Sequence, residues 1–271
     1  DPHYGTLKST RLDFAVCATG ALVQQVQETT TQLWWRMQAV RHVRQQNFPE
    51  AFSSFRAAGV HLPWLQDVQG TQGQNWVARA GLLLRDNVLH RSQIEKAYRR
   101  AIGMARHDIV MANAYFLPDR KLRQALIYAA QRGVRVQLLL QGRYEYFMQY
   151  HAVRPVYRQL MAAGVEIYEY ADSFLHAKVA VIDAHHAHPW ATVGSSNLDP
   201  FSLLLAREAN VVVVDGFFAK QLHAALSQAI ETGSQRVVAE ALLTRSRLQR
   251  GMDWVAFGLM RFAIWLTGNR Y

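Results

Sequence analysis

Residues 176–183 constrain the fold of this chain more than any other part of its sequence. They read His-Ala-Lys-Val-Ala-Val-Ile-Asp, so four apolar residues stand between Lys178 and Asp183. A short apolar run of this kind is typical of a strand that is buried along much of its length. Since residues two apart in a strand share a face, we expect His176 and Lys178 to point the same way.

An imidazole beside an ammonium group suits chemistry on a phosphodiester. The imidazole of His176 can attack phosphorus or move a proton, and Lys178 can hold a phosphoryl oxygen. The polar run Gly-Ser-Ser-Asn-Leu-Asp follows at 194–199. A surface histidine and lysine on an edge strand is the alternative, and the full string H-x-K-x4-D followed by G-S-S-N argues against it.

From residue 75 onward, apolar strands alternate with amphipathic helices. Gly133 and Gly164 each follow a helical segment and are expected to end it. This alternation predicts an α/β fold, with helices layered on a mainly parallel or mixed sheet. The strands are expected at 76–84, 108–114, 134–140, 165–170, 176–183, 190–194 and 208–214.

The motifs together resemble the phospholipase D superfamily, whose mark is the string H-x-K-x4-D followed by a G-S-x-N turn. The flanking segments are most similar to bacterial cardiolipin synthases of the phospholipase D type. The resemblance implies a layered phospholipase D-like fold with a mixed central sheet, and it is best over residues 75 to about 230. The segments that carry it are Asn-Ala-Tyr-Phe-x-Pro at 113–118, Leu-Gln-Gly-Arg-Tyr-Glu-Tyr at 140–146, Gly-Ser-Ser-Asn-Leu-Asp-Pro at 194–200 and Arg-Glu-Ala-Asn at 207–210.

The family usually carries two such halves in one chain, and this sequence holds one H-x-K-x4-D string. Residues 13–38 and 208–230 both run from a carboxylate through an apolar strand and a glycine to a helix, which is a weak internal repeat. Chance similarity between two strand–helix units is the alternative. We therefore expect the chain, which begins Asp-Pro, to be a piece of a longer protein. We expect a remnant of a first half at 1–40, a linker at 41–74, the phospholipase D-like domain at 75–235 and a basic, aromatic tail at 236–271.

The resemblance implies a two-step transfer through a phosphohistidine, without a cofactor or metal. His176 maps to the second motif and takes the general acid/base role, so the nucleophile would come from a missing first half or a second subunit. Asp183 lies too far along the strand to reach the same phosphate, and we expect it to have a structural or orienting role. The expected catalytic residues are His176, Lys178, Asp183, Asn197 and Glu208, and the expected substrate-binding residues are Ser195, Asn113 and Tyr115.

Two carboxylates are candidates for orienting the histidines. An imidazole that works through one nitrogen needs an acceptor on the other. The resemblance implies that Glu208 serves His176, the histidine of its own motif, and that Asp13 serves the absent first histidine. A surface ion pair with Arg207 is the alternative for Glu208.

The segment between Asp183 and Gly194 is longer than the family pattern and contains His185, His186 and His188. A histidine cluster suggests a metal site. We expect an inserted hairpin loop instead, because no cysteine or well-placed carboxylate completes such a site. The single cysteine of the chain excludes an internal disulfide.

The chain carries 30 Lys and Arg against 20 Asp and Glu, a formal charge of +10. This excess predicts an anionic partner, either an acidic membrane or nucleic acid. Tyr115, Phe116, Tyr144 and Tyr146 suit acyl chains or stacked bases equally, so they do not decide the substrate. Residues 253–268 predict either a helix in the lipid headgroup region or a helix packed on the core.

The sequence therefore predicts the second half of a cardiolipin synthase, which joins two phosphatidylglycerol molecules and releases glycerol at the cytoplasmic face of the membrane. Two alternatives remain at this stage. One is a phospholipase D-like nuclease or phosphodiesterase that acts as a homodimer, and the other is an inert membrane-binding half-domain.

Overall fold

The computed structural model divides the chain into two compact units, one made of residues 1–16 and 83–271 and the other of residues 17–82. This division differs from the expected boundaries, because the segment before Val16 joins the larger unit. The origin of residues 1–40 as the remnant of an earlier half remains a prediction. The structure describes residues 10–57, 66–69, 77–86, 90–142, 147–199, 206–238 and 246–266.

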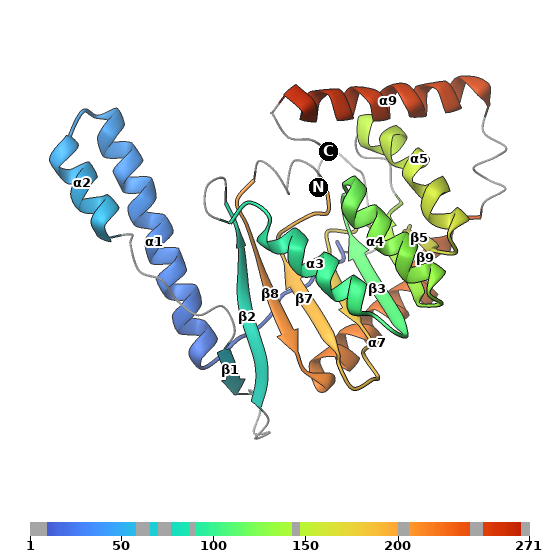
Figure 1. The fold of residues 1–271 in the computed structure, drawn as a ribbon, viewed down its shortest axis with the longest axis horizontal. Coiled ribbons are helices and arrows are strands. Elements are labelled where there is room, and N and C mark those ends of the chain that lie inside the picture. The colour runs from blue at the N-terminus through green and yellow to red at the C-terminus, as the bar shows by residue number, and fades with distance from the viewer. Residues whose placement is uncertain are drawn as a thin grey trace. The chain divides into compact units, whose positions relative to one another are not determined.

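The larger unit is built on a mixed sheet, as the sequence predicted (Figure 1). Strands β3, β4 and β5 run parallel, whereas β6 pairs antiparallel with β3, and β7, β8 and β9 each pair antiparallel with their neighbours. Their order across the sheet is β8-β7-β6-β3-β4-β5-β9. The strands span Asp108–Asn113 (β3), Arg135–Gln141 (β4), Glu166–Tyr170 (β5), Lys178–Ile182 (β6), Trp190–Gly194 (β7), Glu208–Val214 (β8) and Ser234–Arg236 (β9).

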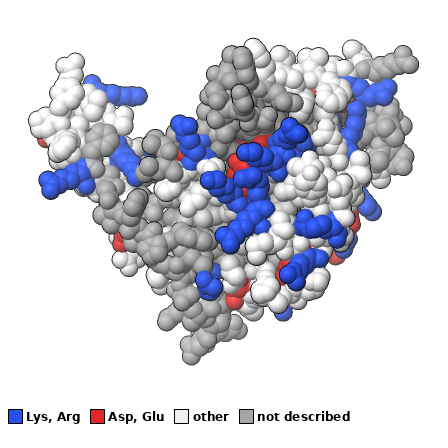
Figure 2. All heavy atoms as spheres, in the orientation of Figure 1, with Lys and Arg blue, Asp and Glu red and all other residues white. Residues whose placement is uncertain are grey.

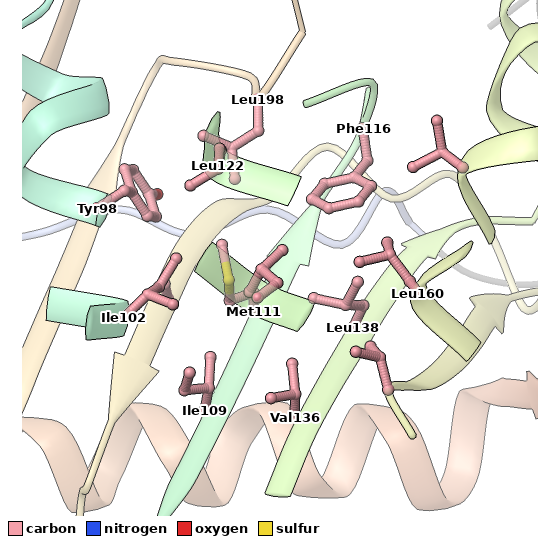
Figure 3. Packing of buried hydrophobic residues seen from close by; sticks show 14 of the residues in the cluster. Tyr98, Ile102, Ile109, Met111, Phe116, Leu122, Val136, Leu138, Leu160 and Leu198 are labelled. Atoms are coloured by element: carbon pink, nitrogen blue, oxygen red, sulfur yellow. The ribbon is translucent and has the colours of Figure 1, made fainter. Parts of the chain in front are cut away.

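Helices cover both faces of this sheet. Alternate residues of one strand point to opposite faces, so Met111 of β3 joins the core under α3, α4, α5 and α9, while Val110 joins the core under α7 (Figure 1). Figure 3 shows the first of these cores, where Met111 and Leu138 lie among side chains from the helices. The helices span Gln93–Met104 (α3), Arg120–Gln131 (α4), Phe147–Ala162 (α5), Gly216–Gly233 (α7) and Arg247–Leu266 (α9).

Local sequence explains several boundaries of these helices. Asp119 caps α4 by accepting a hydrogen bond from the backbone N–H of Leu122 at 2.7 Å. Gly133 follows α4 with a φ of 88°, a left-handed conformation that glycine adopts without steric cost and that ends a helix. Ser92 precedes α3, but its side chain makes no capping hydrogen bond.

Residues 41–74, which were expected to be a linker between two halves, lie in the smaller unit. Helix α1 spans Ala21–Arg44, α2 spans Phe48–Ala57, β1 spans Gln66–Gln69, and β2 begins here and continues into the larger unit over Val77–Arg85. The helix expected after Gly20 is confirmed by α1, which continues beyond residue 38, whereas α2 was not predicted. Leu22 is buried, whereas Val26 and Leu33 are exposed. The predicted strand at 13–19 is also wrong, since a single bridge between Leu12 and Leu175 replaces it.

Among the described residues, no helix is both long enough and apolar enough to cross a membrane.

Candidate active site

The predicted site residues converge on one end of the larger unit's sheet. Asn113, the last residue of β3, lies opposite Lys178, the first residue of β6. Gly194 ends β7 beside Asn210 of β8. The antiparallel pairing of β6 with β3 and β7 therefore brings the His176 strand, the 113–118 segment and the G-S-S-N turn to the same sheet end.

His176 is held by Asp13, not by Glu208. Residues 10–13 lie parallel to 173–176: the backbone N–H of Leu12 donates to the carbonyl of Phe174 at 2.9 Å, and that of His176 donates to the carbonyl of Leu12 at 2.8 Å. This pairing brings the Asp13 Oδ2 to 2.8 Å from the His176 Nδ1. The expected pairing of Glu208 with His176 is therefore wrong in this structure.

Asp13 is suited to act as an acceptor for the ring. Partial burial alone would raise the pKa of Asp13, but the hydrogen bonds from His176 and from the backbone N–H of Phe14 outweigh burial and lower it. The carboxylate is therefore ionised at neutral pH and accepts a hydrogen bond from Nδ1–H. The Nε2 lone pair of His176 is left to attack or to accept a proton.

Lys178 lies almost completely buried beside this pair. Its side chain keeps 6% of its surface exposed, and its Nζ donates to the carbonyl of His176 at 2.7 Å. Burial lowers the pKa of Lys178, and the nearby carboxylates of Asp13 and Glu208 partly oppose that shift. A partly desolvated ammonium next to an imidazole is well placed to hold a phosphoryl oxygen.

Glu208 also lies near enough to Lys178 to interact with its charge. The hydroxyl of Ser195 donates to the Glu208 carboxylate, and the backbone N–H of Ala209 donates to the Ser195 hydroxyl at 3.0 Å. Ser195 is exposed and Glu208 is partly exposed, so both reach the surface of the site. Two carboxylates thus act on the charge of Lys178, and one of them holds the histidine of this chain.

The G-S-S-N turn depends on an asparagine that the sequence did not single out. The buried amide of Asn210 accepts from the backbone N–H of Ser196 at 3.3 Å and donates to Thr192 Oγ1 at 3.3 Å. A Cβ on Gly194 would lie 2.3 Å from the Asn210 side chain, so only glycine fits there. The Arg-Glu-Ala-Asn motif of the sequence contains Asn210 and was the available signal.

Two further asparagines join the turn to the end of β3. Asn197 Oδ1 accepts from the backbone N–H of Tyr115 at 3.3 Å, which directs its amide nitrogen away from that backbone. Asn113 Oδ1 accepts from the backbone N–H of Leu198 at 3.1 Å. Asn113 is 1% exposed, and its buried Nδ2 has no hydrogen-bond partner in the described part of the chain. Asn113 therefore supports the turn from beneath, whereas Asn197 and Tyr115 are partly exposed.

Asp183 lies away from this site, at the opposite end of β6. Five residues along a strand from Lys178 correspond to about 16 Å. Its carboxylate accepts backbone hydrogen bonds from Arg106, His107 and Asp108 at 3.0, 2.8 and 3.1 Å. The geometry agrees with the expected supporting role, and it removes Asp183 from the residues that can touch a substrate.

The histidines that follow Asp183 lie in the hairpin loop between β6 and β7. The ring of His186 stacks on that of His107 at 3.5 Å, and the ring of His185 lies 4.9 Å from that of His223. Within the described ranges, no group of three or more His, Cys, Asp and Glu side chains has the geometry of a metal site.

The aromatic residues that were expected near the site fall into two groups. Phe116 is buried in the core under α3 and α4, so it packs the fold and leaves Tyr115 as the partly exposed ring. Tyr144 and Tyr146 lie outside the described residues.

Residues 98–230 match the family model described as "Cardiolipin synthase, PLD-like domain". Cardiolipin synthase B of Escherichia coli strain K12 is 39% identical over 191 residues, which cover 70% of this chain and 45% of that protein. A minor cardiolipin synthase of Bacillus subtilis is 28% identical over 169 residues, 62% of this chain and 41% of that protein. The chain thus spans less than half the length of these relatives.

Two solved structures share the fold. Phosphatidylserine synthase of Haemophilus influenzae aligns with a TM-score of 0.57 at 10% identity, covering 82% of this chain and 54% of that one. The phospholipase D family member Nuc of Salmonella typhimurium aligns with a TM-score of 0.50 at 18% identity, covering 59% of this chain and 98% of that one. The family match and the 39% identity to a cardiolipin synthase, together with the H-x-K-x4-D string and the G-S-S-N turn, establish that the chain belongs to the phospholipase D superfamily.

Proposed function

We propose that this chain supplies one half of the active site of a cardiolipin synthase, which transfers a phosphatidyl group from one phosphatidylglycerol to another. The pairing of an Asp13-held imidazole with the buried Lys178 ammonium carries this proposal, because it joins a proton-transfer group to a phosphoryl-oxygen donor. The cardiolipin synthase names of the similar proteins supply the substrate class.

The proposed reaction has two steps. A histidine nitrogen bonds to phosphorus, the bond from phosphorus to the glycerol oxygen breaks, and His176 gives its proton to the released glycerol. His176 then takes the proton from the hydroxyl of a second phosphatidylglycerol, whose oxygen bonds to phosphorus as the N–P bond breaks. Lys178 and Asn197 would stabilise the charge on the phosphoryl oxygens in both steps.

The nucleophilic histidine would come from outside this chain's H-x-K-x4-D string, from a first half or a second subunit. Asp13 opens the first of the two repeated units that the sequence suggested, and it serves the histidine of the second. By the same symmetry, Glu208 would serve the incoming histidine. Its position beside Lys178, linked to Ser195, supports that role.

We infer that the reaction takes place at the cytoplasmic face of the membrane, with the protein bound peripherally. The phosphatidylglycerol substrate is a membrane lipid, and the formal charge of +10 favours an anionic surface.

The test is incubation of the full-length protein with labelled phosphatidylglycerol, with release of cardiolipin and glycerol as the expected result. His176→Ala should lower turnover by about 10³-fold or more, because it removes the acid and base of both steps. His188→Ala is the matched control and should retain wild-type turnover, since His188 lies in the exposed loop at the opposite sheet end. Hydrolysis of DNA with no cardiolipin formed, or full activity of His176→Ala, would overturn the proposal.

A further inference from the structure

Helix α9 is apolar on its solvent-facing side as well as on the side that packs against the core. Its solvent-facing side carries Trp254, Val255, Leu259 and Phe262, each between 53% and 62% exposed. Its inward side buries a carboxylate, Asp253, which is 0% exposed. A helix on a soluble domain normally keeps its apolar stripe inward and shows a polar outer side.

The buried carboxylate fastens α9 to the body of the larger unit. Asp253 Oδ1 lies 2.6 Å from His151 Nδ1 of α5, and its Oδ2 lies 3.8 Å from an Arg158 nitrogen. Phe257 and Met260 complete the inward side and join the core. A buried charge with polar partners resists rearrangement, because separating the partners would leave that charge unpaired. The outward direction of the apolar side is therefore determined by packing.

Helix α9 lies on the same side of the unit as the active site. Strand β4 runs parallel to β3, so its carboxyl end lies at the site end, and α5 begins shortly after it. His151, the residue that holds Asp253, is in the first turns of α5. Figure 1 agrees, since β3 points toward the side of the unit on which α9 lies.

Basic side chains gather beside this end. Arg120 and Lys121 are exposed in the first turn of α4, which follows β3 at the site end. Lys96 is exposed near the start of α3, and Figure 2 shows basic side chains gathered over α3 and α4. Cations at a helix N-terminus oppose the helix dipole, so the positions of Arg120 and Lys121 are unfavourable for α4 itself. An anionic surface would relieve that repulsion.

We propose that the site end of the larger unit docks on an anionic phospholipid bilayer, with the outward side of α9 inserted at the headgroup level and the basic starts of α3 and α4 facing the lipid phosphates. This docking rests on the proposed function, because it brings the phosphoryl site to the surface where the substrate lies. Trp254 suits the rim of the inserted side, since tryptophan favours the membrane–water boundary.

Vesicle sedimentation tests this docking separately from turnover. All proteins in this assay carry His176→Ala, so that binding is measured without turnover of the lipid. One set of vesicles is pure phosphatidylcholine, and the other contains phosphatidylcholine with phosphatidylglycerol. Leu259→Ser with Phe262→Ser should weaken binding by on the order of tenfold or more, because binding scales with inserted apolar area. The matched control is Met104→Ser with Phe217→Ser, two exposed apolar residues at the opposite end of the sheet, and should bind as the parent does.

A second variant tests how much the basic side chains contribute to vesicle binding. Arg120→Gln with Lys121→Gln should weaken binding to phosphatidylglycerol vesicles by about fivefold for each charge removed, and the loss should fade at high salt. Equal binding by the α9 variant and its parent, or equal binding to both vesicle types, would overturn the docking. A parent dimer that becomes monomeric in the α9 variant, with vesicle binding unchanged, would assign the surface to a second copy instead. If the protein with His176 intact docks normally but forms no cardiolipin, the docking proposal stands and the proposed function is rejected.

Discussion

The pairing of Asp13 with His176 predicts that removing one carboxylate changes catalysis far more than it changes stability. His176 and Asp13 are 43% and 53% exposed, and exposed ion pairs contribute about 0.2–1 kcal/mol. Asp13→Ala should therefore lower the free energy of unfolding by less than about 1 kcal/mol. A change of that size shifts the midpoint of thermal unfolding by only about 2–4 °C in a chain of this size.

The effect on turnover should be larger, because Asp13 is the acceptor that leaves Nε2 as the working nitrogen of His176. Loss of a partner that orients a histidine costs on the order of 10²-fold in rate, or about 2.7 kcal/mol of barrier. Nitrogen-15 NMR of the histidine rings would report the tautomer directly, with His176 assigned by its absence in His176→Ala. Asp13→Ala should change the His176 pattern, and the matched variant Glu208→Ala should leave it unchanged.

The pair also has a pH signature. The pKa of Asp13 is lower in the folded protein than in the unfolded chain, so the pair stabilises the fold above the unfolded value near pH 4. That contribution should disappear as the pH falls through the lower, folded-state pKa, and it should be absent from Asp13→Ala throughout. A His176 ring pattern that responds to Glu208→Ala but not to Asp13→Ala would refute the assignment and restore Glu208 as the partner.

Three further predictions concern residues around this pair. Lys178→Met should abolish turnover while changing the free energy of unfolding in urea titrations by only about 1 kcal/mol, because removal of a desolvated charge is offset by loss of its hydrogen bond to the His176 carbonyl. Asp183→Ala should lower the free energy of unfolding by about 2–4 kcal/mol, because three backbone N–H groups lose their acceptor. Asp183→Asn should lower it by less, and unchanged stability in the alanine variant would contradict this. Gly194→Ala should destabilise by about 1–3 kcal/mol through its clash with Asn210, and Gly103→Ala, with open space around it, is the control for the added methyl group.

Much of the larger unit could be predicted because its signals are local. The apolar run after Lys178 predicted β6, and all five of its residues are buried. Gly133 and Gly164 end the helices they were expected to end. The hairpin after Asp183 follows from two apolar strands joined by a polar loop. Alternating periodicity over a few residues determines such elements, because the backbone pattern and the buried face are both properties of one segment.

The smaller unit shows where local signals fail. Residues 39–44 end α1 and residues 48–57 form α2, whereas the sequence predicted only a connection there. The intrinsic helix propensity of alanine, glutamine and arginine is a weak signal unless tertiary packing supports it.

The sequence alone determined that a histidine and a lysine stand at the end of a core strand and that a G-S-S-N turn follows. Tertiary structure decided which carboxylate holds His176, since the Asp13 contact joins residues 163 positions apart. It also decided that Lys178 is buried and that α9 turns its carboxylate inward. These outcomes depend on how separate segments pack together, and no pattern within one segment specifies its neighbours across the fold.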